Sequence, residues 1–280
     1  MSTAIYYFSG TGNSLFIAKK LNESLENSEL LPIVRELDAP PGKIDAEKVV
    51  LVFPVYALTV PIPVRDFLKK NDFGSVHYIS AVATRLGIPF NDFKRIDRLM
   101  KPKKLNSHFV LNMGSNDIKV KNYKCPSERD LMELESAVLK ELERISQIIN
   151  GNEESRERDS SYLEALPFGD FRDRLIEWSV PKMMTFSRFI GGVNYYYINS
   201  NCNGCGICSK VCLSGKISMK ENRPGWNKKT LCYMCYACVN FCPSKAIEID
   251  SLPGVPSFSC ENDRYCHPYA GYKDIEGQKT

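Results

Sequence analysis

The sequence contains no long uninterrupted apolar segment. Its most apolar run, residues 49–64, is broken by Pro54, Pro61 and Pro63 and falls short of the roughly 20 residues that a membrane-spanning helix needs. The first residues, MSTAIYYFSGTG, also lack the basic region and the apolar core of a signal peptide. We therefore expect no membrane span and a location in the reducing cytoplasm.

Histidine is scarce, with only His77, His108 and His267 among 280 residues. None of them falls in a segment that the patterns below assign to cofactor binding, and each is expected to be a structural or surface residue. Histidine is the most frequent general acid and base in enzymes. The sequence therefore identifies no proton donor and leaves the catalytic residues unknown.

Cysteine, in contrast, is abundant, with 11 residues. Two copies of the pattern C-x2-C-x2-C-x3-C occur at residues 202–212 and 232–242. The similarity extends to three further pairs of positions: Ser214 with Ser244, Ile217 with Ile247, and Met219 with Ile249. The repeat predicts one small module built from two related halves.

Three kinds of chemistry use closely spaced cysteines. Structural zinc takes four ligands, usually from two separated C-x2-C pairs, and leaves the third cysteine of this pattern without a role. Disulfides need an oxidising compartment. The spacing is instead typical of bacterial [4Fe-4S] proteins, in which three close thiolates bind one cubane and the fourth cysteine binds the other cluster. It predicts two [4Fe-4S] clusters.

The segment from Tyr195 to Asp250 resembles the two-cluster bacterial ferredoxins, and Pro243 follows the last cysteine as in that family. The resemblance implies a small α+β domain with two ligand sets, one of Cys202, Cys205, Cys208 and Cys242 and the other of Cys232, Cys235, Cys238 and Cys212. An oxidised cubane with four thiolates carries about −2, so two clusters would bring the formal charge of +4 to about 0. The excess of basic residues is therefore no argument for a nucleic-acid partner.

The first 150 residues alternate between strand-like and helix-like patterns. Strands are predicted at 3–8, 29–34, 49–53, 78–84 and 108–113, and helices after residue 14 and at 63–70, 91–100 and 127–150. The last helix begins with a Ser127/Asp130 capping pair and ends before Gly151. This alternation predicts an α/β fold with five parallel strands in a doubly wound sheet.

The loop after the first strand, Ser9-Gly10-Thr11-Gly12-Asn13-Ser14, lies where a doubly wound sheet binds its ligand. Its glycines permit a tight turn, its hydroxyls can donate hydrogen bonds, and the following helix directs N–H groups toward a bound anion. The loop lacks the lysine of a P-loop, and Leu15 replaces the third glycine of a dinucleotide fingerprint. Such a neutral loop favours one terminal phosphate, as in FMN, over a pyrophosphate. A purely structural glycine-rich turn is the alternative.

Residues 1–150 resemble the flavodoxin family, with YFSGTGNS as the matching phosphate loop. The resemblance implies a sheet in the order 2-1-3-4-5 and two loops that enclose the isoalloxazine ring of FMN. These loops are Pro54, Val55, Tyr56 and Ala57 after the third strand, and Thr84, Arg85, Leu86 and Gly87 after the fourth. Tyr56 would stack on the ring or cover an edge of the core. Arg85 would stabilise the reduced flavin at N1 or lie on the surface as a solvated charge.

The remaining segments separate the two modules and end the chain. Residues 151–161 are charged and aperiodic, and the aromatic-rich segment 168–190 predicts a helical bridge between the modules or an extension of the first core. We therefore divide the chain into a flavodoxin-like domain, a linker and bridge, a ferredoxin-like domain and an irregular, surface-bound tail, at 1–150, 151–194, 195–252 and 253–280. Within the third part, a hairpin at 217–229 is expected to turn at Arg223-Pro224-Gly225.

Three cysteines remain outside the two repeats. Cys125 is expected to be a spare thiol. Cys260 and Cys266, with His267 adjacent, could bind a metal, although their six-residue separation is no standard ligand spacing.

Together the two halves resemble the flavodoxin–ferredoxin fusion proteins, which are iron–sulfur flavoproteins of anaerobic bacteria and archaea. The resemblance implies an oxidoreductase that passes electrons between two [4Fe-4S] clusters and FMN in one chain and reduces an unidentified acceptor, which could be a small molecule. The alternative is an electron carrier that docks to other redox proteins, such as ferredoxins, flavodoxins or reductases, and has no substrate of its own. A third alternative keeps the flavodoxin-like fold without flavin, as a docking domain for the ferredoxin half.

Overall fold

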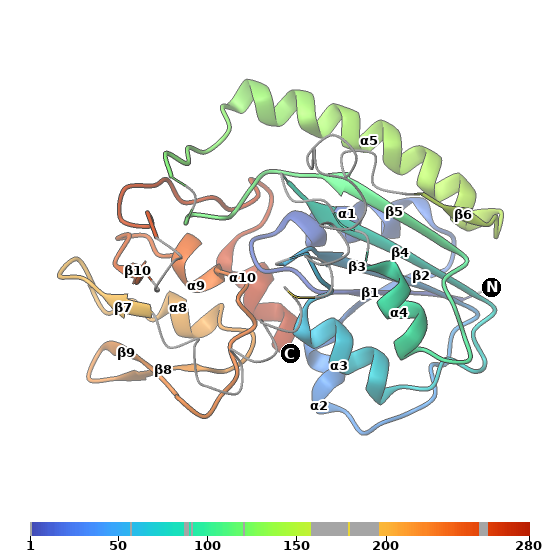
Figure 1. Ribbon diagram of the computed structural model, residues 1–280, viewed down its shortest axis with the longest axis horizontal. Coiled ribbons are helices and arrows are strands. Elements are labelled where there is room, and N and C mark those ends of the chain that lie inside the picture. Colours follow the sequence, from blue (N-terminus) through green and yellow to red (C-terminus); the bar gives the residue numbers. More distant parts are fainter. Residues whose placement is uncertain are drawn as a thin grey trace.

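The structure is a computed structural model, and it describes residues 2–56, 58–86, 90, 92–119, 121–157, 179, 196–251 and 257–280 (Figure 1). Ala57, Gly87 and, apart from Ser179, the bridge predicted at 168–190 lie outside the described residues. The described part of the chain forms a larger N-terminal module around a sheet and a smaller C-terminal module that contains the cysteine repeats (Figure 1).

Parallel strands form the central sheet of the N-terminal module. They are β1 (Thr3–Tyr7), β2 (Ser28–Pro32), β3 (Lys48–Pro54), β4 (Tyr78–Arg85), β5 (Ser107–Asn112) and β6 (Ser155–Arg156). Their order is β2-β1-β3-β4-β5-β6, which confirms the predicted order of the first five strands and adds β6 beside β5. The central strand β3, KVVLVFP, is buried from Lys48 to Phe53, because a parallel sheet with both faces covered needs apolar residues on both sides.

Helices cover both faces of this sheet (Figure 1). One apolar cluster packs α1 (Asn13–Ser24) and α5 (Glu128–Asn150) on one face, and another packs α2 (Ile33–Asp38), α3 (Ile62–Lys70) and α4 (Phe93–Leu99) on the other. The predicted capping pair of α5 is confirmed, since the Asp130 N–H donates to Ser127 Oγ and the Ser127 N–H donates to Asp130 Oδ2. The predicted doubly wound α/β class is confirmed.

The C-terminal module contains two short antiparallel strand pairs. β7 (Tyr196–Ile198) pairs with β10 (Ile247–Ile249), and β8 (Ile217–Lys220) pairs with β9 (Arg223–Trp226). The short helices α8 (Ile207–Lys210) and α9 (Ala237–Asn240) occupy equivalent positions in the two cysteine repeats. This small α+β module agrees with the predicted ferredoxin-like class.

The predicted position of the hairpin turn is wrong. Pro224 and Gly225 belong to β9, and the chain turns at Glu221 and Asn222, whose φ angles are 48° and 59°. Two successive positive φ angles give a tight turn whose twist matches that of the strands. Pro224 is accommodated because, among the described strands, β9 pairs only with β8 and is therefore an edge strand.

The C-terminal segment is folded against both modules, so the expectation of an irregular surface tail is wrong. Within residues 257–280 it forms α10 (Tyr272–Glu276) and the 3-10 helix η1 (Gly277–Lys279), and it buries Ile275 and Gln278 completely. α10 contacts α8 of the C-terminal module, and η1 contacts α2 of the N-terminal module. Figure 1 accordingly shows α10 between the two modules.

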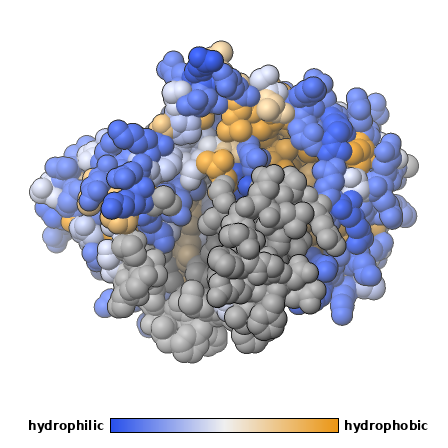
Figure 2. Space-filling view, turned by 45° about the horizontal axis from the view of Figure 1, so that its top comes forward, coloured by the Kyte–Doolittle hydropathy of each residue, from blue (hydrophilic) through white to orange (hydrophobic). Residues whose placement is uncertain are grey.

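Hydrophilic residues cover most of the described surface on the face shown in Figure 2, and hydrophobic side chains are visible near its middle. The large exposed hydrophobic residues of the described part are Leu86, Met132, Tyr197 and Tyr269. Among the described residues, no helix combines the length and the apolar character needed to cross a membrane.

Candidate functional site

The cysteines of the two repeats line two small cavities in the C-terminal module. Each cavity takes three cysteines from one repeat and the last cysteine of the other. We name the two groups by their position relative to the N-terminal module, against whose apolar core Cys235 and Cys238 pack. The distal set is Cys202, Cys205, Cys208 and Cys242, and the proximal set is Cys212, Cys232, Cys235 and Cys238. Each cavity has a volume of about 20 Å³. The fold thus groups the cysteines in the way that the ferredoxin resemblance implies.

Hydrogen-bond donors surround the sulfur atoms. Cys232 Sγ accepts from the Met234 N–H over 3.3 Å, and Cys242 Sγ accepts from the Ala246 N–H over 3.2 Å. Ser244 Oγ lies 3.7 Å from Cys242 Sγ. Such donors stabilise a thiolate relative to the thiol and tune a metal centre bound to it.

Burial opposes the ionisation of the same thiols. It raises the pKa of Cys235 to about 12 and that of Cys208 to about 11. In each set, neighbouring thiolates that are mostly half-buried need compensating positive charge, and the iron ions of a cluster would supply it. The donor set, the N–H bonds and the burial together fit a [4Fe-4S] cluster in each cavity.

The cysteines outside the repeats form no comparable group. Cys260 is exposed, and Cys125 Sγ donates to the carbonyl oxygen of Arg264 over 3.2 Å. Within the described residues, no three His, Cys, Asp or Glu side chains are placed as ligands of a single metal ion. In a cubane each thiolate binds a different iron, so this result does not bear on the two repeats, but it does apply to Cys260, Cys266 and His267. The geometry gives no support to the metal site considered at these positions.

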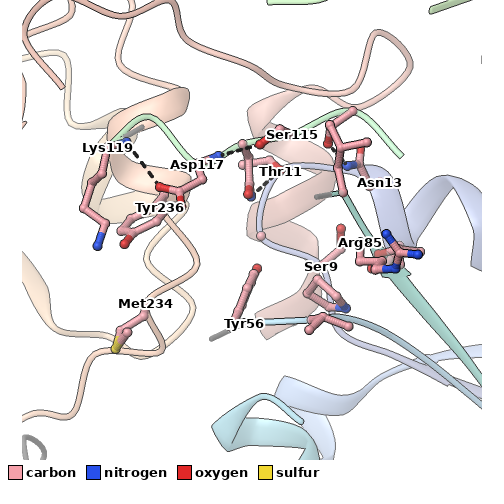
Figure 3. A pocket seen from close by; sticks show the side chains of 18 residues that line it. Ser9, Thr11, Asn13, Tyr56, Arg85, Ser115, Asp117, Lys119, Met234 and Tyr236 are labelled. Carbon is pink, nitrogen blue, oxygen red and sulfur yellow. Dashed lines mark hydrogen bonds between the residues drawn. The ribbon is translucent and has the colours of Figure 1, made fainter. Parts of the chain in front are cut away.

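A larger cavity lies at the carboxyl edge of the sheet, where it meets the C-terminal module (Figure 3). Its volume is about 280 Å³, close to the lower end of the range for small-molecule sites. The loops after β1, β3, β4 and β5 border it, which is the place where doubly wound folds bind ligands. The described residues that line it are Ser9, Gly10, Thr11, Asn13, Ser14, Pro54, Val55, Tyr56, Thr84, Arg85, Leu86, Gly114, Ser115, Asn116, Asp117, Lys119, Met234 and Tyr236.

Most of the residues predicted to bind FMN therefore lie around one cavity. Of those that the structure describes, only Gly12 is outside the lining. The φ angle of Gly12 is 103°, and a Cβ there would lie 2.4 Å from the Cβ of Ala270 and 2.8 Å from that of His267. Gly12 is thus required by the left-handed turn and by the C-terminal segment packed against it, while the neighbouring residues face the cavity.

Hydrogen bonds orient the hydroxyls of the loop after β1. Ser9 Oγ accepts from the Gly12 N–H over 3.1 Å, and Thr11 Oγ1 accepts from Asn116 Nδ2 over 2.9 Å. Because both hydroxyl oxygens accept in these bonds, their hydrogens can be donated to a ligand. At the N-terminus of α1, which starts at Asn13, backbone N–H groups add to the positive potential. The loop can therefore bind an anion without a basic side chain of its own.

Tyr56 and Arg85 border the cavity from the loops after β3 and β4 (Figure 3). The ring of Tyr56 packs edge-on against Phe8, with 6.2 Å between the ring centroids, and burial raises the pKa of its hydroxyl well above the usual value. Tyr56 therefore covers an edge of the core and also faces the cavity. Thr84 Oγ1 lies 2.7 Å from Ser14 Oγ and joins the end of β4 to the loop after β1.

The loop after β5, Gly114–Asp117, is a part of the site that sequence reasoning missed. Asn13 Nδ2 donates to the carbonyl oxygen of Gly114 over 2.7 Å, and Asn116 contacts Thr11 as described above. The loop has the sequence GSND, and small, polar residues directly after a strand are a usable signal for a ligand loop. Ligands of doubly wound folds bind at the carboxyl ends of the strands, and the same rule applied to the fifth strand predicts this loop.

The C-terminal segment, also missed as part of the site, holds the loop after β1 from outside the cavity. Gln278 Nε2 donates to the Ser9 carbonyl oxygen over 2.8 Å, and Gln278 Oε1 accepts from the Ser9 N–H over 2.9 Å. The His267 N–H donates to the Thr11 carbonyl oxygen over 2.8 Å. Gln278 and His267 are both buried, so their hydrogen bonds fix the backbone of the loop after β1 before any ligand binds.

The side chain of His267 is structural, as expected from the sequence. Its ring stacks on Phe16, with 4.4 Å between the ring centroids. Burial lowers its pKa to about 4, so the ring is neutral at neutral pH.

The proximal set lies directly against the loop after β1. A Cβ on Gly10 would lie 2.7 Å from the Cβ and 2.7 Å from the carbonyl oxygen of Cys235, and 2.6 Å from the Tyr56 hydroxyl oxygen. Tyr233, two residues before Cys235, packs edge-on against Phe8 with 6.0 Å between the ring centroids. One apolar cluster is continuous from the sheet into the C-terminal module. The cysteine loop and the candidate phosphate loop are therefore in van der Waals contact.

Comparison with known proteins identifies the C-terminal module. Residues 201–247 match the family model of the 4Fe-4S dicluster domain, and the match includes every cysteine of the distal and proximal sets. The chain joins a 4Fe-4S dicluster domain to a flavodoxin-like domain. The strand order of the sheet makes the N-terminal half flavodoxin-like, because β2-β1-β3-β4-β5 is the flavodoxin order.

Solved structures are similar to parts of this fusion protein. A protein from Bacteroides uniformis ATCC 8492 is 18% identical, with 40% of this chain and 90% of that chain covered and a TM-score of 0.33. Smu.1420 from Streptococcus mutans UA159 is 12% identical, with 53% and 100% covered and a TM-score of 0.35. A flavodoxin from the domain Archaea is 13% identical, with 52% and 99% covered and a TM-score of 0.32. No curated protein matches the sequence significantly.

Proposed function

We propose that this chain is an oxidoreductase that passes electrons between two [4Fe-4S] clusters and one FMN. The contact between Gly10 and Cys235 carries the proposal, because it joins a cluster-binding loop to the candidate phosphate loop. Cofactors held in one chain have a high effective concentration for one another, so transfer between them does not wait for collision. The proposal includes a cytoplasmic location in an anaerobic organism and redox proteins as partners.

The two cysteine sets have different places in this proposal. Each set would hold one cluster through four thiolates, and the N–H bonds to Cys232 and Cys242 would stabilise the ligands. Clusters of this type transfer single electrons, and a flavin accepts one or two. Cys235 of the proximal set faces Gly10, whereas Cys205 of the distal set is exposed. We assign the proximal set to exchange with the flavin and the distal set to exchange with partner proteins.

The cavity residues would hold FMN. The hydroxyls of Ser9 and Thr11 and the first N–H groups of α1 would bind the phosphate, because they form a neutral, donor-rich loop. Tyr56 and Arg85 border the space left for the ring. The positive charge of Arg85 would stabilise negative charge on the reduced ring. Gln278 keeps the loop in place from the other side, so little ordering is needed on binding.

A pure electron carrier is the second candidate function. The observation that favours it is the lining of the cavity, which contains no histidine among the described residues. His267 stacks on Phe16, and His108 stacks on Phe93 with 4.1 Å between the ring centroids. Reduction of an organic acceptor by two electrons needs protons, whereas electron transfer to a partner protein does not.

The cofactor content is the first test of the proposal. Anaerobic purification followed by quantification of iron, sulfide and flavin should give about eight irons, about eight sulfides and one FMN per chain. A protein with four irons, or with zinc in place of iron, would contradict the cluster assignment. A protein that contains no flavin and takes up none from solution would leave a ferredoxin with a flavodoxin-like docking domain.

Reoxidation kinetics distinguish the enzyme from the carrier. The dithionite-reduced protein is mixed anaerobically with small organic acceptors and, separately, with ferredoxins and flavodoxins, and the flavin absorbance is followed. Turnover with a small acceptor supports the oxidoreductase. Reoxidation by redox proteins alone, with no reaction with small acceptors or dioxygen, supports the carrier.

A further inference from the structure

The two cysteine repeats differ at two backbone positions that should be equivalent. In the first repeat the residues on either side of Cys205 are Gly204 and Gly206, both with a φ angle of 74°. In the second repeat Met234 and Tyr236 flank Cys235, with φ angles of 57° and 53°. L side chains rarely adopt this left-handed region, and glycine adopts it without strain. The second repeat therefore holds two side chains in a conformation that they disfavour.

Space alone does not explain the difference. A Cβ on Gly204 would lie 2.7 Å from the Asn222 carbonyl oxygen, so glycine is required there by crowding. A Cβ on Gly206 would have its nearest neighbour at 3.9 Å, in the side chain of Met219. Gly206 is therefore not required by crowding, since a side chain at this position would have room. The backbone of the cysteine loop needs only two glycines, so the side chains at 234 and 236 have roles of their own. Both pack against the apolar cluster of the C-terminal module, and both also border the large cavity.

Both side chains line the large cavity. Figure 3 shows Met234 and Tyr236 on the side of the cavity opposite Ser9 and Arg85. The backbone of Tyr236 is held in place, because Asn240 Nδ2 lies within 3.1 Å of the Tyr236 carbonyl oxygen and donates to it. The ammonium group of Lys119 lies 5.9 Å from the centroid of the Tyr236 ring.

Asn240 also connects Tyr236 to other parts of the cavity lining and to the C-terminal segment. Its Nδ2 lies 3.3 Å from the Asn116 carbonyl oxygen in the loop after β5, and its Oδ1 accepts from the Tyr265 N–H over 2.9 Å. Asn240 is buried, with 5% of its surface exposed. The dicluster domain, the loop after β5 and the C-terminal segment therefore meet at the residue that positions Tyr236.

We propose that Tyr236 and Met234 form the wall of the flavin site on the dicluster side and contact the isoalloxazine ring. The inference rests on the proposed function and deepens it, since it assigns ring binding to residues of the other domain. An aromatic ring and a thioether are polarisable groups that pack well against a flat aromatic ligand. In this arrangement Cys235 binds the cluster, and its two neighbours in the sequence, Met234 and Tyr236, contact the isoalloxazine ring.

Replacement by glycine separates this role from a structural one. In Tyr236→Gly and Met234→Gly the relief of backbone strain offsets part of the packing that is lost from the apolar cluster, so the chain should fold and bind its full iron content. FMN affinity should fall about tenfold in Tyr236→Gly, because a stacking contact with a planar ligand is lost. Tyr236→Phe should retain most of the affinity. FMN is titrated into the anaerobic, cluster-loaded, flavin-free protein, and iron is determined in parallel.

Lys245→Gly is the matched control. Lys245 has a φ angle of 48° and is not part of the cavity lining, so this change relieves similar strain without an effect on FMN affinity. Unchanged FMN affinity in Tyr236→Gly would overturn the inference, and so would a loss of iron equal to the loss of FMN. A wild-type protein that binds no FMN would overturn the proposed function and the inference with it, so the two failures are distinguishable.

Discussion

Replacement of Gly10 by alanine would test the contact between the two domains. The added Cβ would lie 2.7 Å from the Cβ and the carbonyl oxygen of Cys235 and 2.6 Å from the Tyr56 hydroxyl oxygen. Non-bonded heavy atoms are in favourable contact at about 3.5–4.0 Å, so the methyl group overlaps each neighbour by roughly 0.8 Å or more. The atoms of Cys235 cannot move unless the cysteine loop shifts. Overpacking of this kind lowers the free energy of unfolding by about 1–3 kcal/mol.

Unfolding of the anaerobic, cluster-loaded protein measures this change. A loss of about 1–3 kcal/mol corresponds to a fall in Tm of roughly 2–12 °C for a chain of this size. FMN affinity should also decrease, because the phosphate loop and the cysteine loop are forced apart. Gly42→Ala is the control, since its Cβ would approach only the Pro40 carbonyl oxygen, at 4.0 Å. If Gly10→Ala has the Tm and the FMN affinity of the wild type, the contact between the domains is refuted.

Three further predictions follow from the cysteine sets, the C-terminal segment and a buried histidine. Cys242→Ser should lower the iron content by disrupting the distal cluster, whereas Cys125→Ser should not; full iron content in both variants would contradict the ligand assignment. Gln278→Ala should lower the free energy of unfolding by about 1–3 kcal/mol, because it leaves a buried N–H and a carbonyl oxygen without partners. The exposed Gln147→Ala serves as its control, and equal stability of the two variants would refute the role of Gln278. Burial lowers the pKa of His267 from 6.5 to about 4, so the unfolded chain binds a proton in this interval and the folded chain does not. Stability should therefore decrease as the pH falls from about 6.5 to about 4, and His267→Phe should reduce this dependence; a pH profile that is identical in the variant would exclude the histidine as its cause.

Local patterns were sufficient to predict the two domains. The spacing of the cysteines, the glycine- and hydroxyl-rich loop and the capping pair of α5 each act within about ten residues or fewer, so the sequence displays them directly. The alternation of strands and helices predicted a doubly wound parallel sheet, because parallel strands joined by helices allow few topologies, and the resemblance to flavodoxins implied the strand order. The hairpin turn was misplaced because Pro224 and Gly225 are strong turn formers, yet the positive φ angles needed for a two-residue turn fall at Glu221 and Asn222.

Contacts between distant parts of the chain were decided only by the tertiary structure. Gln278 and Ser9 are 269 positions apart, and Asn240 and Asn116 are 124 apart, so neither pair produces a local pattern. The roles of Met234 and Tyr236 depend in the same way on a cavity whose other wall belongs to the flavodoxin-like domain. The sequence by itself determined the cysteine spacing typical of [4Fe-4S] proteins and the glycine- and hydroxyl-rich loop after the first strand, and from these we predict where iron and phosphate bind. Only the tertiary structure decided that the loop of Gly10 and the loop of Cys235 lie against each other, because the docking of one domain on another depends on the complementarity of whole surfaces and not on the order of neighbouring residues.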